Sequence, residues 1–128
     1  MNKDEKLLYQ DESFLIRGAI IEVYKHLGAG FLESVYQEGL ERELALQGIP
    51  FESQPQLQIQ YKGDPLAHTF QPDFVCFGKI IVELKSVKAL LPEHEAQLIN
   101  YLRASGMRLG FLVNFSNVPQ AKIKRFVR

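Results

Sequence analysis

The sequence is short of cysteine, net charge and long apolar runs, and each shortage excludes a class of protein. The single cysteine among 128 residues, Cys76, excludes an internal disulfide and a zinc site built from several cysteines. No apolar run approaches the roughly 20 residues of a membrane helix, and the first residues do not resemble a signal peptide. We therefore expect a cytoplasmic protein that does not enter a membrane.

Basic and acidic residues balance, with 15 of each. Zero net charge argues against a protein that coats nucleic acid by charge alone, although it is compatible with a local basic patch. The chain also lacks a P-loop, a Gly-x-Gly-x-x-Gly motif and a nucleophile elbow at any serine. Candidate chemistry must therefore be sought among other side chains.

The hydrophobic content of 46% is that of an ordinary globular protein. We expect a frayed N-terminus over residues 1–12 and one domain over residues 13–128. Apolar residues at helical spacing predict helices over residues 13–27, 32–47 and 92–105. A short basic helix is expected after Pro119.

Strand patterns fill the middle of the chain. Within residues 51–61, Leu57, Ile59 and Tyr61 alternate with Gln56, Gln58 and Gln60, which predicts a half-exposed strand over the segment. Residues 70–77 and 80–85 read as a hairpin, and residues 109–115 read as a second buried strand parallel to 80–85. The order is helix, helix, three-strand meander, helix, strand, helix, which predicts an α/β fold, an α+β sandwich with a mixed sheet.

The hairpin over residues 70–85 organises the rest of the chain, because charges follow its buried strands. Asp73 opens the first strand, and Glu83 and Lys85 end the second. Side chains two apart in a strand share a face, so Glu83 and Lys85 lie together. Buried charges are costly unless they act together. Two carboxylates beside a lysine suit a divalent metal that lowers the pKa of water and neutralises a phosphate. The alternative is a surface ion pair between Glu83 and Lys85.

Turn geometry decides whether Asp73 and Glu83 can share an ion. A two-residue turn at Gly78-Lys79 would place Asp73 opposite Leu84, so Asp73 and Glu83 would point to opposite sides of the sheet. A shared metal requires a shift of one residue. A three-residue loop over residues 77–79, a bulge, or the end of regular pairing before Asp73 would each supply that shift.

Two helices carry further candidates. Gln97 and Tyr101 are four residues apart and share a helix face, with His94 on the same stripe. Glu33 lies in the first turn of the helix over residues 32–47, where an acidic residue also favours the helix dipole. By themselves these positions favour structural roles: a tyrosine at the edge of the core, a solvated glutamine, an incidental histidine and an acidic residue at a helix start.

Taken together, the motifs resemble a known family. Pro72-Asp73 followed by Glu83-Leu84-Lys85 resembles the signature of the PD-(D/E)xK nuclease superfamily, and Gln97-x-x-x-Tyr101 is similar to the accessory motif of its RecB-like branch. Gly30-x-x-Glu33-x-x-Tyr36 resembles the motif of the small GxxExxY family. The resemblance covers roughly residues 17–125. It implies a nuclease-like core with an extra N-terminal helix and a short C-terminal helix.

The resemblance also implies roles. Glu33, Asp73 and Glu83 would bind Mg²⁺ or Mn²⁺, Lys85 would be catalytic, and Gln97 and Tyr101 would support the site. We therefore expect a metal-dependent nuclease acting on nucleic acid, DNA in the first place. One alternative is a non-catalytic binding or regulatory module with the same fold. Another is a structural protein whose apolar surface only needs a partner, either a second copy in a homodimer or another protein. If nucleic acid binds, the basic tail is the expected contact, through Lys122, Lys124, Arg125 and Arg128.

Overall fold

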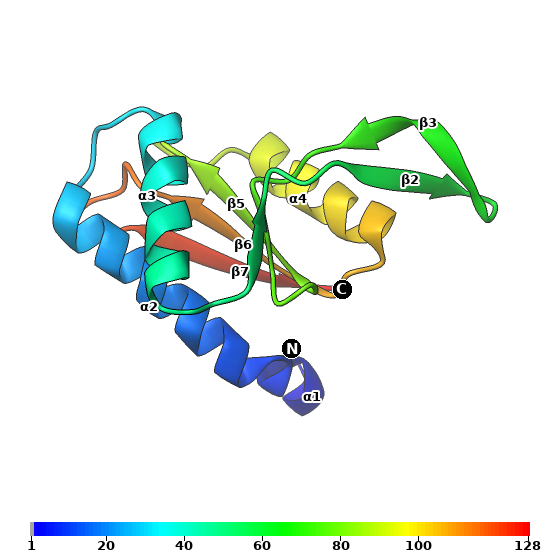
Figure 1. Cartoon of the computed structure of the whole chain (residues 1–128), viewed down its shortest axis with the longest axis horizontal. Helices are drawn as coiled ribbons and strands as arrows, with labels where there is room; N and C mark the ends of the chain where they lie inside the picture. Colours follow the sequence, from blue (N-terminus) through cyan, green and yellow to red (C-terminus); the bar gives the residue numbers. More distant parts are fainter. Residues whose placement is uncertain (1) are drawn as a thin grey trace.

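A five-stranded mixed sheet lies between α2 and α3 on one face and α4 on the other (Figure 1). The computed structural model describes residues 2–128. Its helices are α1 (Lys3–Leu7), α2 (Gln10–Leu27), α3 (Glu33–Leu46) and α4 (Pro92–Ser105). Its strands are β1 (Phe51–Ser53), β2 (Leu57–Tyr61), β3 (Asp64–Phe70), β4 (Phe74–Cys76), β5 (Ile80–Lys85), β6 (Leu109–Asn114) and β7 (Lys122–Val127). The predicted mixed α/β fold is confirmed. Within residues 2–128, no helix is long and apolar enough to cross a membrane.

The strand order of the large sheet is β1-β4-β5-β6-β7. β5 and β6 run parallel, with Ile80 opposite Leu109 and Lys85 opposite Asn114, and the other neighbouring strands are antiparallel. Parallel strands need a long crossover connection, and α4 supplies it. The predicted unit of strand, helix and parallel strand is therefore confirmed.

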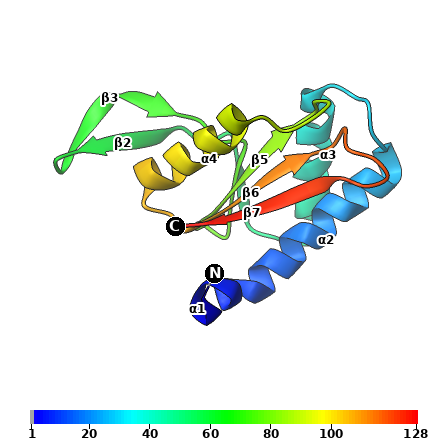
Figure 2. The same cartoon turned by 180° about the vertical axis from the view of Figure 1, so that it is seen from behind.

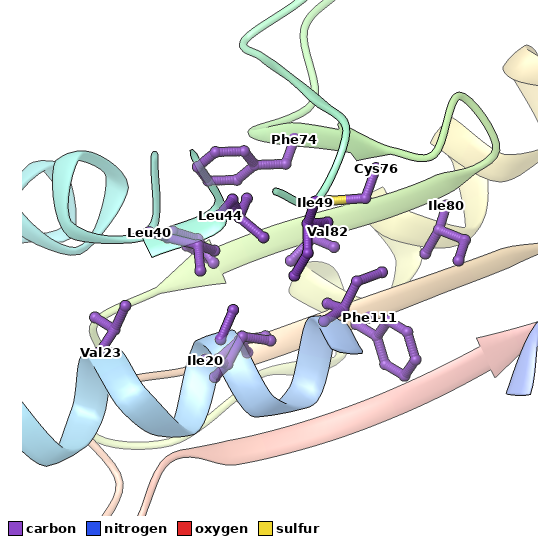
Figure 3. Packing of buried hydrophobic residues seen from close by; sticks show 14 of the residues in the cluster. Ile20, Val23, Leu40, Leu44, Ile49, Phe74, Cys76, Ile80, Val82 and Phe111 are labelled. Atoms are coloured by element: carbon purple, nitrogen blue, oxygen red, sulfur yellow. The ribbon is translucent and has the colours of Figure 1, made fainter. Parts of the chain in front are cut away.

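Two apolar layers hold the helices against the sheet. Side chains of β5 alternate between them: Ile80, Val82 and Leu84 pack with α2 and α3, and Ile81 packs with α4. Figure 3 shows Ile80 and Val82 on the side of the sheet that faces α2, in the same apolar layer as Ile20. Burial of each such side chain contributes roughly 1.5–3 kcal/mol. By the same alternation, Glu83 and Lys85 belong to the face that α4 covers.

Within residues 1–12, where we expect a frayed N-terminus, residues 3–7 and 10–12 are helical; residue 1 lies outside the described residues. Asn2 Oδ1 accepts a hydrogen bond from the Glu5 N–H at 2.8 Å and caps α1. Arg125 Nη2, on β7, donates to the carbonyl oxygens of Glu5 at 2.7 Å and Leu8 at 3.1 Å. Carbonyls at a helix end are short of intrahelical donors, so the arginine ties this segment to the sheet.

The single strand predicted over residues 51–61 is also wrong, because β1 and β2 belong to different sheets. Between them Gln54 has a φ of 51°, which breaks the extended conformation. β2 pairs only with β3, and the resulting hairpin projects beyond α4 (Figures 1 and 2). The predicted meander therefore consists of β1, β4 and β5, with this hairpin inserted after β1.

The basic tail is a strand and not the predicted helix. β7 pairs antiparallel with β6 over its whole length. Ile123 and Val127 pack against the larger apolar layer, and Phe126 packs against the smaller one. Alternate burial on two faces is the strand pattern. Pairing with the open edge of β6 therefore prevails over the local helix signal of Pro119.

Candidate active site

A three-residue turn joins β4 to β5. Cys76 lies opposite Ile80, so residues 77–79 form the turn. Phe77 and Gly78 have φ angles of 56° and 67°, in the left-handed region that glycine adopts without steric cost and phenylalanine does not. The shift of one residue that a shared metal site requires is therefore confirmed.

Asp73 and Glu83 come directly after the last regular pair, Phe74 opposite Val82. The Asp73 N–H donates to Glu83 Oε1 at 2.7 Å, and the Leu84 N–H donates to Asp73 Oδ2 at 2.7 Å. Each carboxylate is thus held by the backbone of the opposite segment. Among the described residues, no hydrogen bond reaches the second oxygen of either carboxylate. We call Asp73 and Glu83 the carboxylate pair.

Burial makes the carboxylate pair costly to ionise. Glu83 is 4% exposed. Burial, followed by the charge of Asp73, raises the pKa of Glu83 to about 8, although the Asp73 N–H and the Lys85 charge act in the opposite direction. Burial also raises the pKa of Asp73, against the hydrogen bond from Leu84 and the charge of Lys85. Because a cation would offset both effects, the pair favours binding of a positive ion.

Lys85 and Glu33 bring charge to the pair from two elements. Burial raises the pKa of Glu33, the charge of Lys85 lowers it, and the charge of Asp73 raises it. These influences place Glu33, at the start of α3, close to the end of β5. Within residues 2–128, the Lys85 ammonium forms no ion pair at 4.0 Å or less. The alternative of a simple ion pair between Glu83 and Lys85 is therefore not observed.

Tyr101 of α4 faces the same group. Burial raises the pKa of Tyr101, and the charges of Glu83 and Asp73 raise it further. The phenol therefore stays protonated near neutral pH and can donate a hydrogen bond. Its ring also packs on Phe70 with 4.9 Å between the ring centroids, which anchors the projecting hairpin of β2 and β3 to α4.

The other two candidates on α4 differ from Tyr101. Gln97 is exposed and makes no hydrogen bond with the part of the chain that the structure describes. His94 Nδ1 accepts a hydrogen bond from the Leu91 N–H at 3.0 Å. That contact caps the start of α4, so His94 has a structural role.

Tyr36 holds the loop that leads into α3. Its hydroxyl donates to the Gly28 carbonyl oxygen at 2.5 Å and accepts from the Phe31 N–H at 3.2 Å. Its side chain is fully buried. Gly30 in this loop has a φ of 106°, which side-chain-bearing residues rarely adopt. In the spacing Gly-x-x-Glu-x-x-Tyr, the glycine therefore allows the turn before α3, and the hydrogen bonds of the buried tyrosine hold that loop and so position Glu33.

Comparison with known proteins identifies the family. The family model of the PD-(D/E)XK nuclease superfamily matches residues 10–126, which include the carboxylate pair, Lys85 and Tyr101. The chain belongs to the PD-(D/E)XK nuclease superfamily. The crystal structure of SSO0001 has a similar fold, with a TM-score of 0.58 and 18% identity over 91% of this chain and 76% of that chain. No curated protein matches the sequence significantly.

PD-(D/E)XK nucleases generally use divalent metal ions, and the carboxylate pair has suitable donors. Mg²⁺ is held by one or two carboxylates together with waters and phosphate oxygens. Asp73 and Glu83 supply two carboxylates, each with a second oxygen that no described residue engages. No group of three or more His, Cys, Asp or Glu residues is gathered as a metal site among residues 2–128. The structure therefore does not bring Glu33 together with the pair as a three-ligand group.

A groove of about 680 Å³ opens beside the carboxylate pair of this PD-(D/E)XK protein. Its lining is mostly acidic: Glu33, Ser34, Gln37, Glu38, Glu41, Gln54 and Asp73. Phosphate is repelled by such a surface unless cations are present. The groove therefore favours cations over a bare anionic ligand.

Two supporting residues escaped the sequence analysis. Gln37 Nε2 donates to the Asp73 carbonyl oxygen at 3.0 Å and to Ser53 Oγ at 2.9 Å, which fixes the backbone of the carboxylate pair against α3. Its position four residues after Glu33, on the same helix face, was the available signal. The 1% exposed Asn114 accepts from the Val87 N–H at 3.1 Å and donates to the Val87 carbonyl oxygen at 2.8 Å. It holds the loop after Lys85, and a lone polar residue in an apolar run was its signal.

The predicted basic cluster is divided by the strand. Lys124 Nζ forms an ion pair with Glu95 of α4 at 2.5 Å. Arg125 points to the opposite face, where it binds α1. Lys122 and Arg128 are exposed. The four residues therefore do not present one continuous phosphate-binding face.

Proposed function

We propose that this PD-(D/E)XK protein is a nuclease that uses Mg²⁺ or Mn²⁺ to hydrolyse phosphodiester bonds of nucleic acid, with DNA as the expected substrate. We further propose that it belongs to the GxxExxY group. The observation that carries the proposal is the register of the hairpin. It places Asp73 and Glu83 side by side and holds each through a backbone hydrogen bond.

Asp73 and Glu83 would hold the ion, and Glu33, which the structure does not gather with them as a three-ligand group, would move toward the bound ion as a third donor. When bound, the ion would lower the pKa of water and neutralise charge that develops on phosphorus. The raised pKa values of all three carboxyl groups support this assignment, because burial makes their charges unfavourable without a cation.

The remaining residues would act on the substrate. Lys85 carries its charge on the face of Glu83 without an ion pair in the described chain, so it can orient a phosphate oxygen. Tyr101 keeps its phenolic proton and would donate a hydrogen bond from the α4 side. The exposed amide of Gln97 lies one helical turn earlier and would contact the nucleic acid.

Phosphate contacts away from the site would come from β7. Of the four predicted residues, Lys122 and Arg128 are exposed and suit a phosphate without rearrangement. Lys124 and Arg125 already make contacts with α4 and α1, so their part in binding would compete with those contacts.

A cleavage panel tests the proposal. Single-stranded, double-stranded and branched DNA, and the matching RNAs, are incubated with Mn²⁺, with Mg²⁺ and with a chelator. We expect metal-dependent cleavage that Asp73→Asn abolishes. Calorimetric titration with Mn²⁺ separates the rival class: metal binding without cleavage of any substrate would point to a non-catalytic module. Cleavage that survives both the chelator and Asp73→Asn would contradict the proposal.

A further inference from the structure

Helix α2 exposes apolar side chains on the face turned away from the sheet. Phe14 is 77% exposed, Ile21 is 53% exposed and Leu15 is 44% exposed. The opposite face of the helix, which includes Ile16 and Ile20, is fully buried. Helix α2 itself lies at the outside of the molecule in Figure 1. Contiguous exposed apolar side chains on a helix indicate an interaction surface.

Gly18 lies at the centre of this exposed face. A glycine inside a helix costs roughly 0.5–1 kcal/mol relative to alanine. Packing within the chain does not account for it, because no heavy atom of the described residues lies within 4 Å of a Cβ built at Gly18. Its φ is an ordinary helical one, so the backbone does not require glycine either. What glycine does permit is close approach of a second helix.

The charges around Gly18 identify that helix. In an antiparallel pair of α2 helices centred on Gly18, each residue faces the residue at the same distance on the other side of the glycine. Leu15 is then level with Ile21 of the other copy, Phe14 with Glu22, and Asp11 with Lys25, whose 69% exposed side chain lies 3.9 Å from Glu22 of its own helix. All of these residues lie within about 60° of Gly18 around the helix axis, at 100° per residue. Leu15 and Ile21 thus meet as apolar groups and Asp11 and Lys25 as opposite charges, whereas Phe14 is level with Glu22 and lies next to Ile21.

We propose that α2 is a dimerisation surface on which a second copy of this chain packs its own α2 antiparallel across Gly18. Such an interface is isologous, because the same patch serves both copies. Two grooves flank this exposed face: one of about 550 Å³ beside Ile21, lined also by Tyr24, Ile123 and the basic residues Arg17 and Lys122, and one of about 270 Å³ beside Phe14, lined also by Arg17 and Arg125. The Phe14 ring of one copy lies opposite the Ile21 end of the other and is received there.

The dimer leaves the candidate active site open. The groove beside Asp73 is lined by residues of α3 and by Gln54, and no residue of α2 lines it. The proposal therefore does not depend on nuclease activity, and either can fail without the other.

Sedimentation equilibrium of the full chain over a range of concentrations tests the surface. Gly18→Gln adds a long side chain to open space and removes a helix-interior glycine, so the monomer keeps its fold. We expect a wild-type dimer and a dissociation constant at least about tenfold higher for Gly18→Gln, a change of about 1.4 kcal/mol. Ala45→Gln, the same addition at an exposed position of α3, is the control and should leave the dissociation constant unchanged.

A charge exchange tests the partner and its direction. Lys25→Asp and Asp11→Lys should each weaken the dimer, and the double variant should restore it, because the antiparallel arrangement then regains both pairs. A wild-type monomer at all concentrations would overturn the proposal. So would a dimer that Gly18→Gln leaves intact, or a double variant that is weaker than either single one.

Discussion

At the proposed active site, Asp73 and Glu83 are costly to ionise because they are buried. Glu83 is almost fully buried, and its carboxylate lies hydrogen-bonded beside that of Asp73. Apolar residues of similar size would stabilise such a position better in a metal-free protein. Lys85 lies on the same face without an ion pair to fix it within residues 2–128. A bound cation would compensate the two carboxylates, and a bound phosphate would compensate Lys85, so the arrangement suits a protein that binds both.

We predict that Lys85→Ala reduces the rate of cleavage roughly 100- to 1000-fold, equivalent to about 2.7–4 kcal/mol of transition-state stabilisation. Metal binding and the melting temperature should change little, because the ammonium makes no ion pair with described residues. Single-turnover cleavage and calorimetry measure the two effects. Lys88→Ala, an exposed lysine three residues later, is the control. Wild-type cleavage by the Lys85 variant would exclude a catalytic role.

We predict that the metal-free protein loses stability as pH rises, because of Glu83. Its pKa of about 8 in the folded chain lies above its ordinary value of 4.5. Between these values the folded chain binds more protons than the unfolded chain, so the free energy of unfolding falls with rising pH. Glu83→Gln should remove most of that fall. Urea denaturation in a chelator at pH 5, 7 and 9 measures it, with Glu52→Gln on β1 as an exposed control.

Short elements position these residues. The left-handed turn after β4 sets the register of the hairpin, and the loop before α3 sets the start of the helix that carries Glu33. Tyr36 links that loop to the core, since its ring stacks on Phe115 with 4.4 Å between centroids and 5° between planes. The Tyr36 hydroxyl thus holds the loop that precedes Glu33, and the Tyr36 ring packs in the apolar core.

We predict that Tyr36→Phe weakens Mn²⁺ binding and slows cleavage while the fold is kept. The variant lacks the hydrogen bonds to Gly28 and Phe31, each worth about 0.5–1.5 kcal/mol, and so loosens the loop before Glu33. Tyr24→Phe is a matched control, because the Tyr24 hydroxyl donates to the Asn117 carbonyl oxygen at 2.7 Å, away from the site. If both variants affect metal binding equally, the loop does not position Glu33.

At the scale of the whole molecule, the proposed active site, the proposed dimerisation surface and the basic edge strand lie on different parts of the sheet. Glu83 and Lys85 lie on the face that α4 covers, at the end of β5 that is also close to the start of α3, and α2 with its exposed apolar side chains covers the other face. β7 closes the edge beside β6 and carries lysine and arginine residues, which protect an edge strand from pairing with another chain. Its basic residues therefore have a structural explanation as well as a proposed role in phosphate binding.

We predict that Lys122→Gln/Arg128→Gln weakens DNA binding equally across sequences. The slope of log affinity against log salt should decrease by about 2, near 0.9 for each phosphate that the variant no longer neutralises. Fluorescence anisotropy at several salt concentrations measures it. Lys3→Gln/Arg42→Gln removes the same charge from exposed positions on α1 and α3 and is the control. An equal decrease in both variants would show a general charge effect and not a contact through β7.

Local hydrophobic patterns were sufficient to predict α2, α3 and α4, from apolar residues at helical spacing, and β5 and β6, from short β-branched and apolar runs that are buried on both faces. The motif spacing likewise predicted Asp73, Glu83 and Lys85 as a group. From the sequence one could state that a shared metal site requires a one-residue shift between Asp73 and Glu83. Whether the hairpin has that shift could be seen only in the structure.

Tertiary packing decided the rest. With a three-residue turn, Phe74 and Cys76 enter the larger apolar layer together with Ile80 and Val82; a two-residue turn would have sent them to the face of α4. Which layer they fill depends on helices distant in the sequence. The same holds for residues 122–127, where an unpaired edge of β6 and two apolar layers select a strand over a local helix signal. Local patterns determine the period of an element, whereas its pairing, and hence the face each charge occupies, depends on what is packed against it.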